Sequence, residues 1–190
     1  MEQPKNNLKI ITDKKNARVI LPNMLTLIGV CIGLTSIRFS FNGQFDLAII
    51  AIIFAALFDW LDGRIARLIK GTSEVGKELD SLADVISFGV APAFIMYFWT
   101  LSSLGKFGWL LCLIYVSCVA LRLARFNVTK PIDGSVYEGM PITFNGFNFA
   151  LIYFISQFVS YGSNELYIYT GIAIISAYLM ISTHRIKKII

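Results

Sequence analysis

Long apolar runs separated by short polar or glycine-containing segments dominate this chain. The hydrocarbon core of a bilayer is about 30 Å thick and takes roughly 20 helical residues to cross. The runs lack the two-residue alternation of a membrane β-barrel, and a helix satisfies its own backbone hydrogen bonds, so helices are expected. The pattern predicts six transmembrane helices, at residues 19–40, 45–70, 78–101, 107–128, 140–161 and 165–184.

The predicted fold class is therefore all-α, a polytopic membrane protein whose six helices form one catalytic domain over residues 19–190. Residues 1–18 are polar and basic and are predicted to be a cytosolic N-terminal segment. The first apolar run, residues 19–37, is too long for the apolar region of a signal peptide and is followed by further apolar segments. It is therefore predicted to be retained as a span.

The composition agrees with a membrane protein and excludes several other classes. Hydrophobic residues make up 56% of the chain and charged residues 15%, against roughly 25% charged in ordinary globular proteins. A compact water-soluble enzyme would need more polar surface than this chain has. The 3 Cys lie inside apolar runs with no metal-binding spacing, which excludes a disulfide framework.

The distribution of Lys and Arg predicts the orientation in the membrane. All but two of the 17 basic residues fall at the termini or beside the loops after the second and fourth spans; Arg38 and Lys106 fall on the other side. Because basic residues stay on the cytosolic side, both termini are expected in the cytosol, as in a multi-pass protein of the inner (cytoplasmic) membrane. The net charge of +5 suits contact with anionic membrane lipids and requires no nucleic acid.

Four carboxylates interrupt the apolar pattern where the second span ends and the third begins. Asp59 and Asp62 are three residues apart, and Asp80 and Asp84 are four apart, so each pair shares one helix face. Helices joined by a short loop run antiparallel, which allows the two acidic faces to point at each other.

Such a cluster requires neutralisation, because carboxylates in a low-dielectric site repel one another strongly. A ligand set of oxygens without Cys or His favours hard divalent cations, so the cluster predicts two ions of Mg²⁺ or Mn²⁺. The alternative is that the acids are interfacial charges paired with Arg64, Arg67 and Lys77.

Small residues accompany the acids. Gly63 inside a helix costs about 1 kcal/mol relative to Ala. Together with Ala66 and Gly76 it would let a bulky ligand or its phosphates approach the backbone. Helix packing is the alternative use of small residues in membranes, and it suits Gly29 and Gly33 of the first span better.

Residues 59–84 read D-x-x-D-G-x-x-A-R, eight residues, then G-x-x-x-D-x-x-x-D. This pattern resembles the signature of the CDP-alcohol phosphatidyltransferase family without a departure. The resemblance implies a six-helix homodimer, a bimetal site open to the cytosol, and a CDP-linked lipid donor from which an alcohol displaces CMP.

Within that family the chain resembles the phosphatidylserine synthase branch, on residues 80–93, 21–26, 121–127 and 138–141. Relatives that use glycerol phosphate usually carry Lys where this chain has Val85. The implied activity is transfer of the phosphatidyl group from CDP-diacylglycerol to L-serine. The resemblance extends over residues 19–145, and the last two predicted spans add only hydrophobicity.

The resemblance also implies residue roles. Asp59, Asp62, Asp80 and Asp84 would hold the metals, and Asp84 would be the general base for the acceptor hydroxyl. A second set would bind CDP-diacylglycerol: Asn23, Thr26, Gly63, Ala66, Arg67 and Gly76. The alternative for Asn23 and Thr26 is that they are ordinary polar residues near the start of the first helix. The alternative for Arg67 is that it forms an ion pair with an Asp.

Arg122 and Arg125 end the fourth span three residues apart, with Asn127 and Glu138 near them in sequence. They are predicted to hold the serine carboxylate in forked hydrogen bonds. The alternative is that they anchor the helix at the cytosolic interface.

Other functions predict other features. A synthase using glycerol 3-phosphate or inositol phosphate would need a denser basic pocket. An ion-coupled transporter also uses intramembrane carboxylates but predicts inverted repeats or broken helices, and neither is apparent in the sequence. An Asp-rich prenyltransferase would place its Asp motifs in distant parts of the chain.

Overall fold

The computed structural model describes residues 14–69 and 73–128, together with 136–138, 153–155, 168, 170–171, 174–175, 178 and 185–187. Most of the described residues are helical. The helical elements are α1 (Lys14–Phe41), α2 (Phe45–Leu68), α3 (Glu74–Asp84), the π-helix η2 (Val85–Val90), α4 (Ala91–Trp99), the 3₁₀ turn η3 (Leu101–Leu104) and α5 (Lys106–Val128).

The predicted helices at 19–40, 45–70, 78–101 and 107–128 are found, the third as the continuous run of α3, η2 and α4. Among the described residues, three helical stretches are long and apolar enough to cross a membrane: Ile20–Phe41, Glu74–Trp99 and Lys106–Val128. Helix α2 has an apolar middle but carries Asp46 near one end and three charged motif residues near the other. The predicted spans at 140–161 and 165–184 lie almost entirely outside the described residues.

Two short strands depart from the all-helical prediction. Strand β1 (Val136–Glu138) pairs antiparallel with β2 (Arg185–Lys187), and Tyr137 stands opposite Ile186. The apolar periodicity of the spans contains no information on this pairing, because it joins segments almost 50 residues apart.

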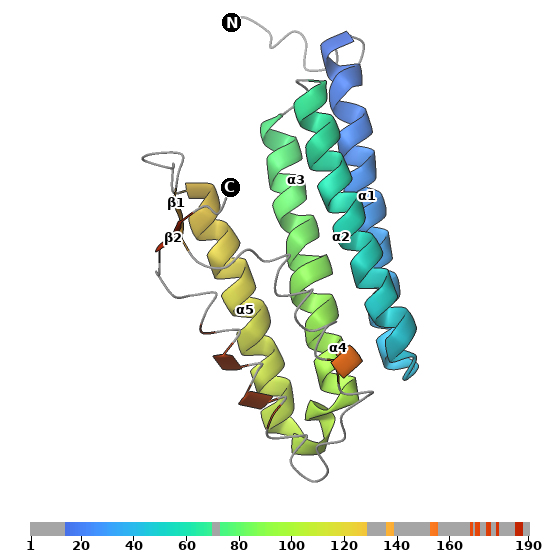
Figure 1. Cartoon of the computed structure of the whole chain (residues 1–190), viewed down its shortest axis with the longest axis vertical. Coiled ribbons are helices and arrows are strands. Elements are labelled where there is room, and N and C mark those ends of the chain that lie inside the picture. Colours follow the sequence, from blue (N-terminus) through green and yellow to red (C-terminus); the bar gives the residue numbers. More distant parts are fainter. Residues whose placement is uncertain are drawn as a thin grey trace, which may run out of the picture.

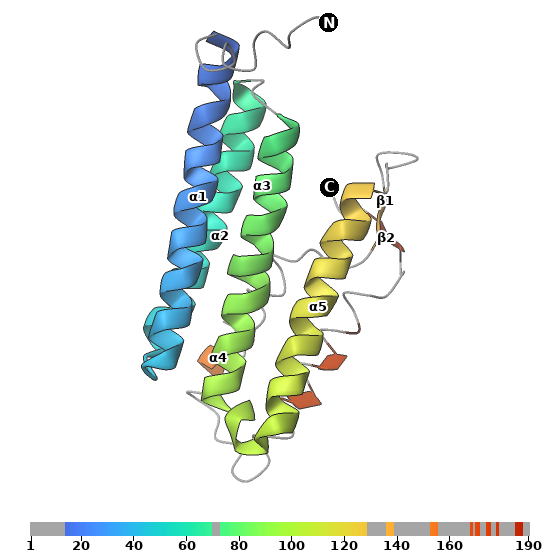
Figure 2. The same cartoon turned by 180° about the vertical axis from the view of Figure 1, so that it is seen from behind.

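The long helices lie side by side and alternate in direction (Figures 1 and 2). The turn between α1 and α2 is tight: Gly43 has a φ of 73°, and the Gln44 amide donates to the Phe39 carbonyl at 2.9 Å. Glycine adopts this left-handed conformation without steric cost. The short turn makes α1 and α2 antiparallel and brings the start of α1 beside the end of α2.

Close packing of α1 fixes its neighbours. The Ser36 hydroxyl donates to the Ala48 carbonyl of α2 at 2.7 Å. A Cβ on Gly33 would lie 2.7 Å from the Ser87 hydroxyl oxygen and 3.1 Å from the Ser87 Cα, so only glycine fits there. The prediction that Gly29 and Gly33 serve helix packing is confirmed by these contacts, because Gly29 lies against Phe58 of α2.

The π-helix η2 begins directly after Asp84. Pro92 has no N–H, so the Phe88 carbonyl lacks the donor that an α-helix would supply four residues later. The Tyr115 hydroxyl of α5 donates to this carbonyl at 3.2 Å, and the Tyr115 side chain is only 1% exposed. Helix α5 is thereby tied to the segment that follows the acidic cluster.

The two ends of the helices differ in chemistry. Phe41, Phe94, Tyr97, Phe98 and Trp109 form edge-on or tilted ring contacts where α4 ends and α5 begins. Aromatic side chains of this kind concentrate at membrane interfaces. The described basic side chains lie mostly at the opposite end of the helices: Arg64, Arg67, Lys77, Arg122 and Arg125.

Large apolar side chains stay exposed along the helices, among them Leu34 of α1, Leu57 of α2 and Ile114 of α5. Several apolar helices with such surfaces indicate a membrane-embedded protein, because a water-exposed surface rarely carries so large an apolar area.

Candidate metal and substrate site

The carboxylates of two antiparallel helices converge. Asp59 and Asp62 of α2 and Asp80 of α3 each offer one oxygen, and these three oxygens lie within 4.8 Å of one another. Asp62 is only 4% exposed, and the other two side chains are half-buried. The sequence-based expectation that the two acidic faces meet is therefore borne out by the geometry.

Asp84 lies one turn beyond Asp80 on the same helix. Its Oδ1 atom is buried and has no hydrogen-bond partner. Together with Asp59 and Asp62 it lines a small cavity of about 10 Å³, which is close to the space taken by one water-sized sphere. The cluster thus extends inward from the three converging carboxylates.

The nearby cations do not neutralise this cluster. The Arg64 guanidinium stacks over the Trp60 ring at 5.0 Å, and Arg67 Nε donates to the Gly63 carbonyl at 2.9 Å. Within the described part of the chain, none of the four carboxylates forms an ion pair. Three converging carboxylates and one unpartnered buried oxygen fit a site for divalent cations with oxygen ligands. The contacts do not support the alternative of interfacial ion pairs.

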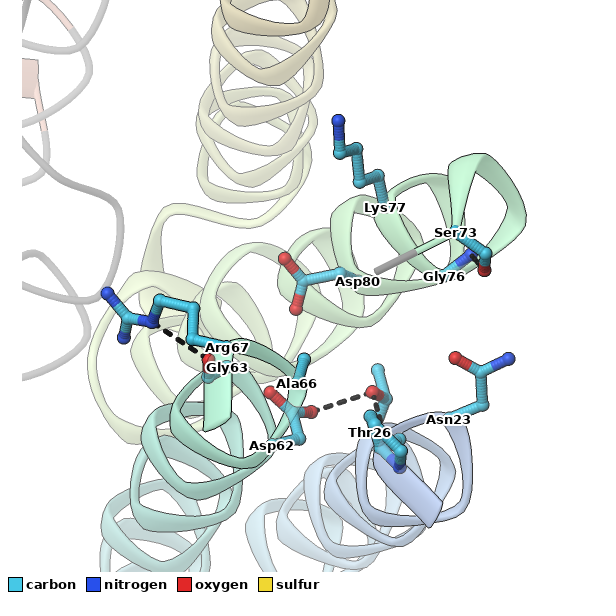
Figure 3. A pocket seen from close by; sticks show the side chains of 11 residues that line it. Asn23, Thr26, Asp62, Gly63, Ala66, Arg67, Ser73, Gly76, Lys77 and Asp80 are labelled. Atoms are coloured by element: carbon cyan, nitrogen blue, oxygen red, sulfur yellow. Dashed lines mark hydrogen bonds between the residues drawn. The ribbon is translucent and has the colours of Figure 1, made fainter. Parts of the chain in front are cut away.

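A pocket of about 200 Å³ opens beside the acids, between α1, α2 and α3 (Figure 3). Its lining residues are Pro22, Asn23, Thr26, Asp62, Gly63, Ala66, Arg67, Ser73, Gly76, Lys77 and Asp80. The structure thus brings together all six residues that were expected to bind a CDP-linked lipid.

Three lining residues were missed as site residues: Pro22, Ser73 and Lys77. The Ser73 hydroxyl accepts a hydrogen bond from the Gly76 amide at 2.9 Å and caps α3. A serine just before a predicted helix is a common N-cap residue, so this role of Ser73 could have been predicted from the sequence. The start of α3 lies at this pocket, and the first turn of a helix favours negative groups.

The two pocket glycines differ in their surroundings. A Cβ on Gly76 would lie 3.0 Å from Asn23 Oδ1 and 3.1 Å from Ser73 Oγ, so α3 needs glycine to approach α1. A Cβ on Gly63 would meet only the Arg67 guanidinium, at 3.9 Å. Packing therefore does not require glycine at position 63, and its missing side chain leaves space in the pocket.

The two arginines of α5 are not equivalent. Arg122 is half-buried, its Nε atom is buried without a hydrogen-bond partner, and it lies within electrostatic range of Asp84. Arg125 is exposed. Nearby, the Asn127 amide donates to the Ser81 hydroxyl at 3.0 Å and joins α5 to α3. The side chain of Glu138 lies outside the described structure.

Comparison with known proteins agrees with this geometry. The sequence pattern of the family described as CDP-alcohol phosphatidyltransferase matches residues 19–182. The chain belongs to the CDP-alcohol phosphatidyltransferase family, as the motif from Asp59 to Asp84 indicated.

Several individual members of this family are similar in sequence to the chain. The chain is 51% identical over 128 residues to the CDP-diacylglycerol–serine O-phosphatidyltransferase of Mycobacterium leprae, covering 64% of this chain and 42% of that protein. The enzyme of the same name from Helicobacter pylori is 41% identical over 128 residues, covering 67% and 54%. The archaetidylserine synthase of Methanothermobacter thermautotrophicus is 39% identical over 140 residues, covering 70% and 58%. The chain spans about half the length of these relatives.

Proposed function

We propose that this protein transfers the phosphatidyl group of CDP-diacylglycerol to the hydroxyl of L-serine and releases CMP. The observation that carries the proposal is the meeting of Asp59, Asp62 and Asp80 beside a pocket lined by Gly63 and Gly76. Similarity to enzymes named for serine phosphatidyl transfer supports serine as the acceptor.

In this proposal Asp59, Asp62 and Asp80 hold two divalent ions, Mg²⁺ or Mn²⁺, and Asp84 completes the set. Bound there, divalent ions offset the charge of a pyrophosphate and make CMP a better leaving group. The chain's own contribution is to fix four carboxylates on two helices that are packed along α1, so the acids are positioned before the substrate arrives.

The donor would occupy the 200 Å³ pocket, with its acyl chains in the bilayer. Gly63 and Ala66 leave room beside α2, and the start of α3 and the Lys77 ammonium offer positive groups to phosphate oxygens. Asn23, Thr26, Arg67 and Gly76 would complete the donor site. Phosphoryl transfer depends mainly on positioning and charge neutralisation, which this pocket supplies.

The acceptor would lie between Asp84 and α5. The serine hydroxyl oxygen forms a bond to the phosphatidyl phosphorus, the bond from that phosphorus to the bridging oxygen of CMP breaks, and the hydroxyl proton passes to Asp84. The unpartnered Oδ1 of Asp84 leaves an acceptor free for that proton. Arg122, with its unpartnered Nε, would bind the serine carboxylate, with Arg125 as a second donor.

The wider assembly is also proposed. Residues 19–190 would form one six-helix domain, with residues 1–18, both termini and the active site in the cytosol, in a homodimer in the inner membrane. The gathering of basic residues at the acidic end of the helices supports this orientation. Tags at both termini should be reachable only from the cytosolic face, and a periplasmic terminus would contradict six spans. Cross-linking in membranes should give a dimer.

The decisive experiment supplies the purified protein with CDP-diacylglycerol, Mn²⁺ or Mg²⁺, and one labelled acceptor at a time. Serine should yield labelled phosphatidylserine and an equal amount of CMP, while glycerol 3-phosphate and inositol phosphate should yield neither. Preferential use of a phosphorylated acceptor would keep the family chemistry and overturn serine. CMP release that persists in EDTA would overturn the metal site.

A further inference from the structure

Thr26 and Asp62 form the partition between the two cavities of the site. Both residues line the 200 Å³ pocket, and both line the small cavity that also contains Asp59 and Asp84. Thr26 is 6% exposed and Asp62 is 4% exposed, so the contact between them is shielded from solvent. Figure 3 shows Thr26 on α1 reaching across to Asp62 on α2.

The Thr26 hydroxyl has two acceptors within reach and one hydrogen to give. Its Oγ1 lies 2.6 Å from Asp62 Oδ2 and 3.1 Å from the Pro22 carbonyl oxygen. Bonds from a hydroxyl to a carboxylate are typically about 2.5–2.7 Å long and are stronger than bonds between neutral groups. The shorter contact is therefore the one that carries the hydrogen, and Thr26 donates to Asp62.

We propose that Thr26 is a positioning residue that fixes the orientation of the Asp62 carboxylate for a divalent ion. The inference rests on the proposed metal site and changes the role of Thr26, which acts on the donor through Asp62 and not by contact with it. The hydrogen bond to Oδ2 fixes the plane of a carboxylate that offers one oxygen to the acidic cluster. Partners of this kind hold ligating carboxylates in place, and their loss typically weakens metal binding about 10–100-fold.

The fold favours this role. Threonine in a helix is restricted to two main rotamers about its first side-chain torsion, and the one adopted by Thr26 puts its hydroxyl within reach of both Asp62 and the Pro22 carbonyl. Because α1 and α2 are joined by a tight turn and packed through Ser36, the helix carrying Thr26 has little freedom to move away from Asp62.

The same helix offers a matched control. Thr35 donates to the carbonyl four residues earlier, that of Cys31, at 2.8 Å. Its side chain is exposed, and within the described part of the chain no hydrogen bond joins it to an acid. Thr26→Val and Thr35→Val therefore make the same chemical change on one helix, but only the first removes a hydrogen bond to a carboxylate.

The test is a titration of the purified full chain with Mn²⁺ followed by electron paramagnetic resonance, without CDP-diacylglycerol. Thr26→Val should weaken Mn²⁺ binding about 10–100-fold. Thr26→Ser, which keeps the hydroxyl, should stay within a few-fold of the parent, and Thr35→Val should match the parent. Thr26→Ala gives the same comparison if Thr26→Val does not fold, as judged by size exclusion and thermal unfolding.

Two results would overturn the positioning role while leaving the metal site in place. One is Mn²⁺ binding by Thr26→Val or Thr26→Ala that equals that of the parent. The other is weakened binding of CDP-diacylglycerol with unchanged Mn²⁺ binding, which would make Thr26 a donor contact. A parent protein that binds no Mn²⁺ would instead overturn the metal site itself, and the role of Thr26 with it.

Discussion

The two sides of the acidic cluster are built differently. On the proposed donor side, the pocket walls come from α1, α2 and α3, which are close in sequence and packed together. On the proposed acceptor side, Arg122 comes from α5, which is held by the Tyr115 bond to Phe88 and by the link between Asn127 and Ser81. The donor side is thus fixed by neighbouring helices, and the acceptor side by long-range contacts. We expect changes on α5 to alter acceptor use while donor binding is retained.

The largest effect is expected where both sides depend on the same groups. Asp59→Asn, Asp62→Asn and Asp80→Asn should each lower CMP release by more than the ~10–100-fold that loss of an outer-shell partner causes, because each removes a metal-binding carboxylate. EDTA should abolish activity in the parent, and added Mn²⁺ should restore it. Asp46→Asn, at the far end of α2, is the control and should retain activity. Equal losses in Asp46→Asn and Asp62→Asn would point to misfolding and not to metal loss.

The next effect separates the acceptor side from the donor side. Arg122→Lys keeps the charge but loses the forked geometry, so the KM for serine should rise. Loss of a charged hydrogen bond costs about 1.5–3 kcal/mol, or roughly 10- to 150-fold. Steady-state kinetics should show kcat nearly unchanged, as expected when a uniform binding contact is lost, and the KM for CDP-diacylglycerol within a few-fold.

Arg125→Lys sharpens that comparison, because Arg125 is exposed whereas Arg122 is half-buried. Its effect on the serine KM should be smaller than that of Arg122→Lys. If neither substitution changes the serine KM, the acceptor is bound elsewhere, and the segment at strand β1, which contains Tyr137 and Glu138, becomes the next candidate.

Gly63→Ala tests the proposed donor pocket in the way that the arginine substitutions test the proposed acceptor site. Among the described residues, the added methyl meets only the flexible end of Arg67, at 3.9 Å, and alanine stabilises a helix by about 1 kcal/mol relative to glycine. The protein should unfold at the same or a higher temperature, yet its kcat/KM for CDP-diacylglycerol should fall about tenfold or more, since the methyl enters the pocket. Gly171→Ala, whose Cβ meets no described atom within 4 Å, should change neither quantity. A fully active Gly63→Ala variant would mean that the donor lies away from this wall.

The smallest effect is expected from the link between α3 and α5. Asn127→Ala removes the exposed hydrogen bond to Ser81, and Ser81→Ala removes that bond together with the one that Ser81 donates to the Lys77 carbonyl; each bond has a net contribution of about 0.5–1.5 kcal/mol. The serine KM should rise a few-fold while donor kinetics stay constant, because the bond positions α5 and not the pocket walls. A double variant should be no worse than Ser81→Ala alone, because that substitution already removes the shared bond. An additive double effect would show that the two residues act separately.

The motif residues could be read from the sequence because their geometry is local. The spacing of Asp59, Asp62, Asp80 and Asp84 determines which helix faces carry the acids, and a short loop makes the two helices antiparallel. The small residues Gly63, Ala66 and Gly76 follow the same helical faces, so the donor pocket could be predicted with them. The positions of Lys and Arg along the chain likewise predicted which helix ends lie on the same side of the membrane.

Other features were decided by tertiary structure, because they depend on contacts between distant segments. No local pattern shows that Tyr115 donates to the carbonyl left free by Pro92, or that a π-helix follows Asp84. Nor does spacing alone separate Arg122 from Arg125, since residues three apart share a face but differ in burial once α5 is packed. The sequence by itself determined which residues are the candidates for the chemistry. Only the packing of α1 against α2 decided that Thr26 binds Asp62, because a hydrogen bond across 36 residues requires the folded backbone to bring both partners together.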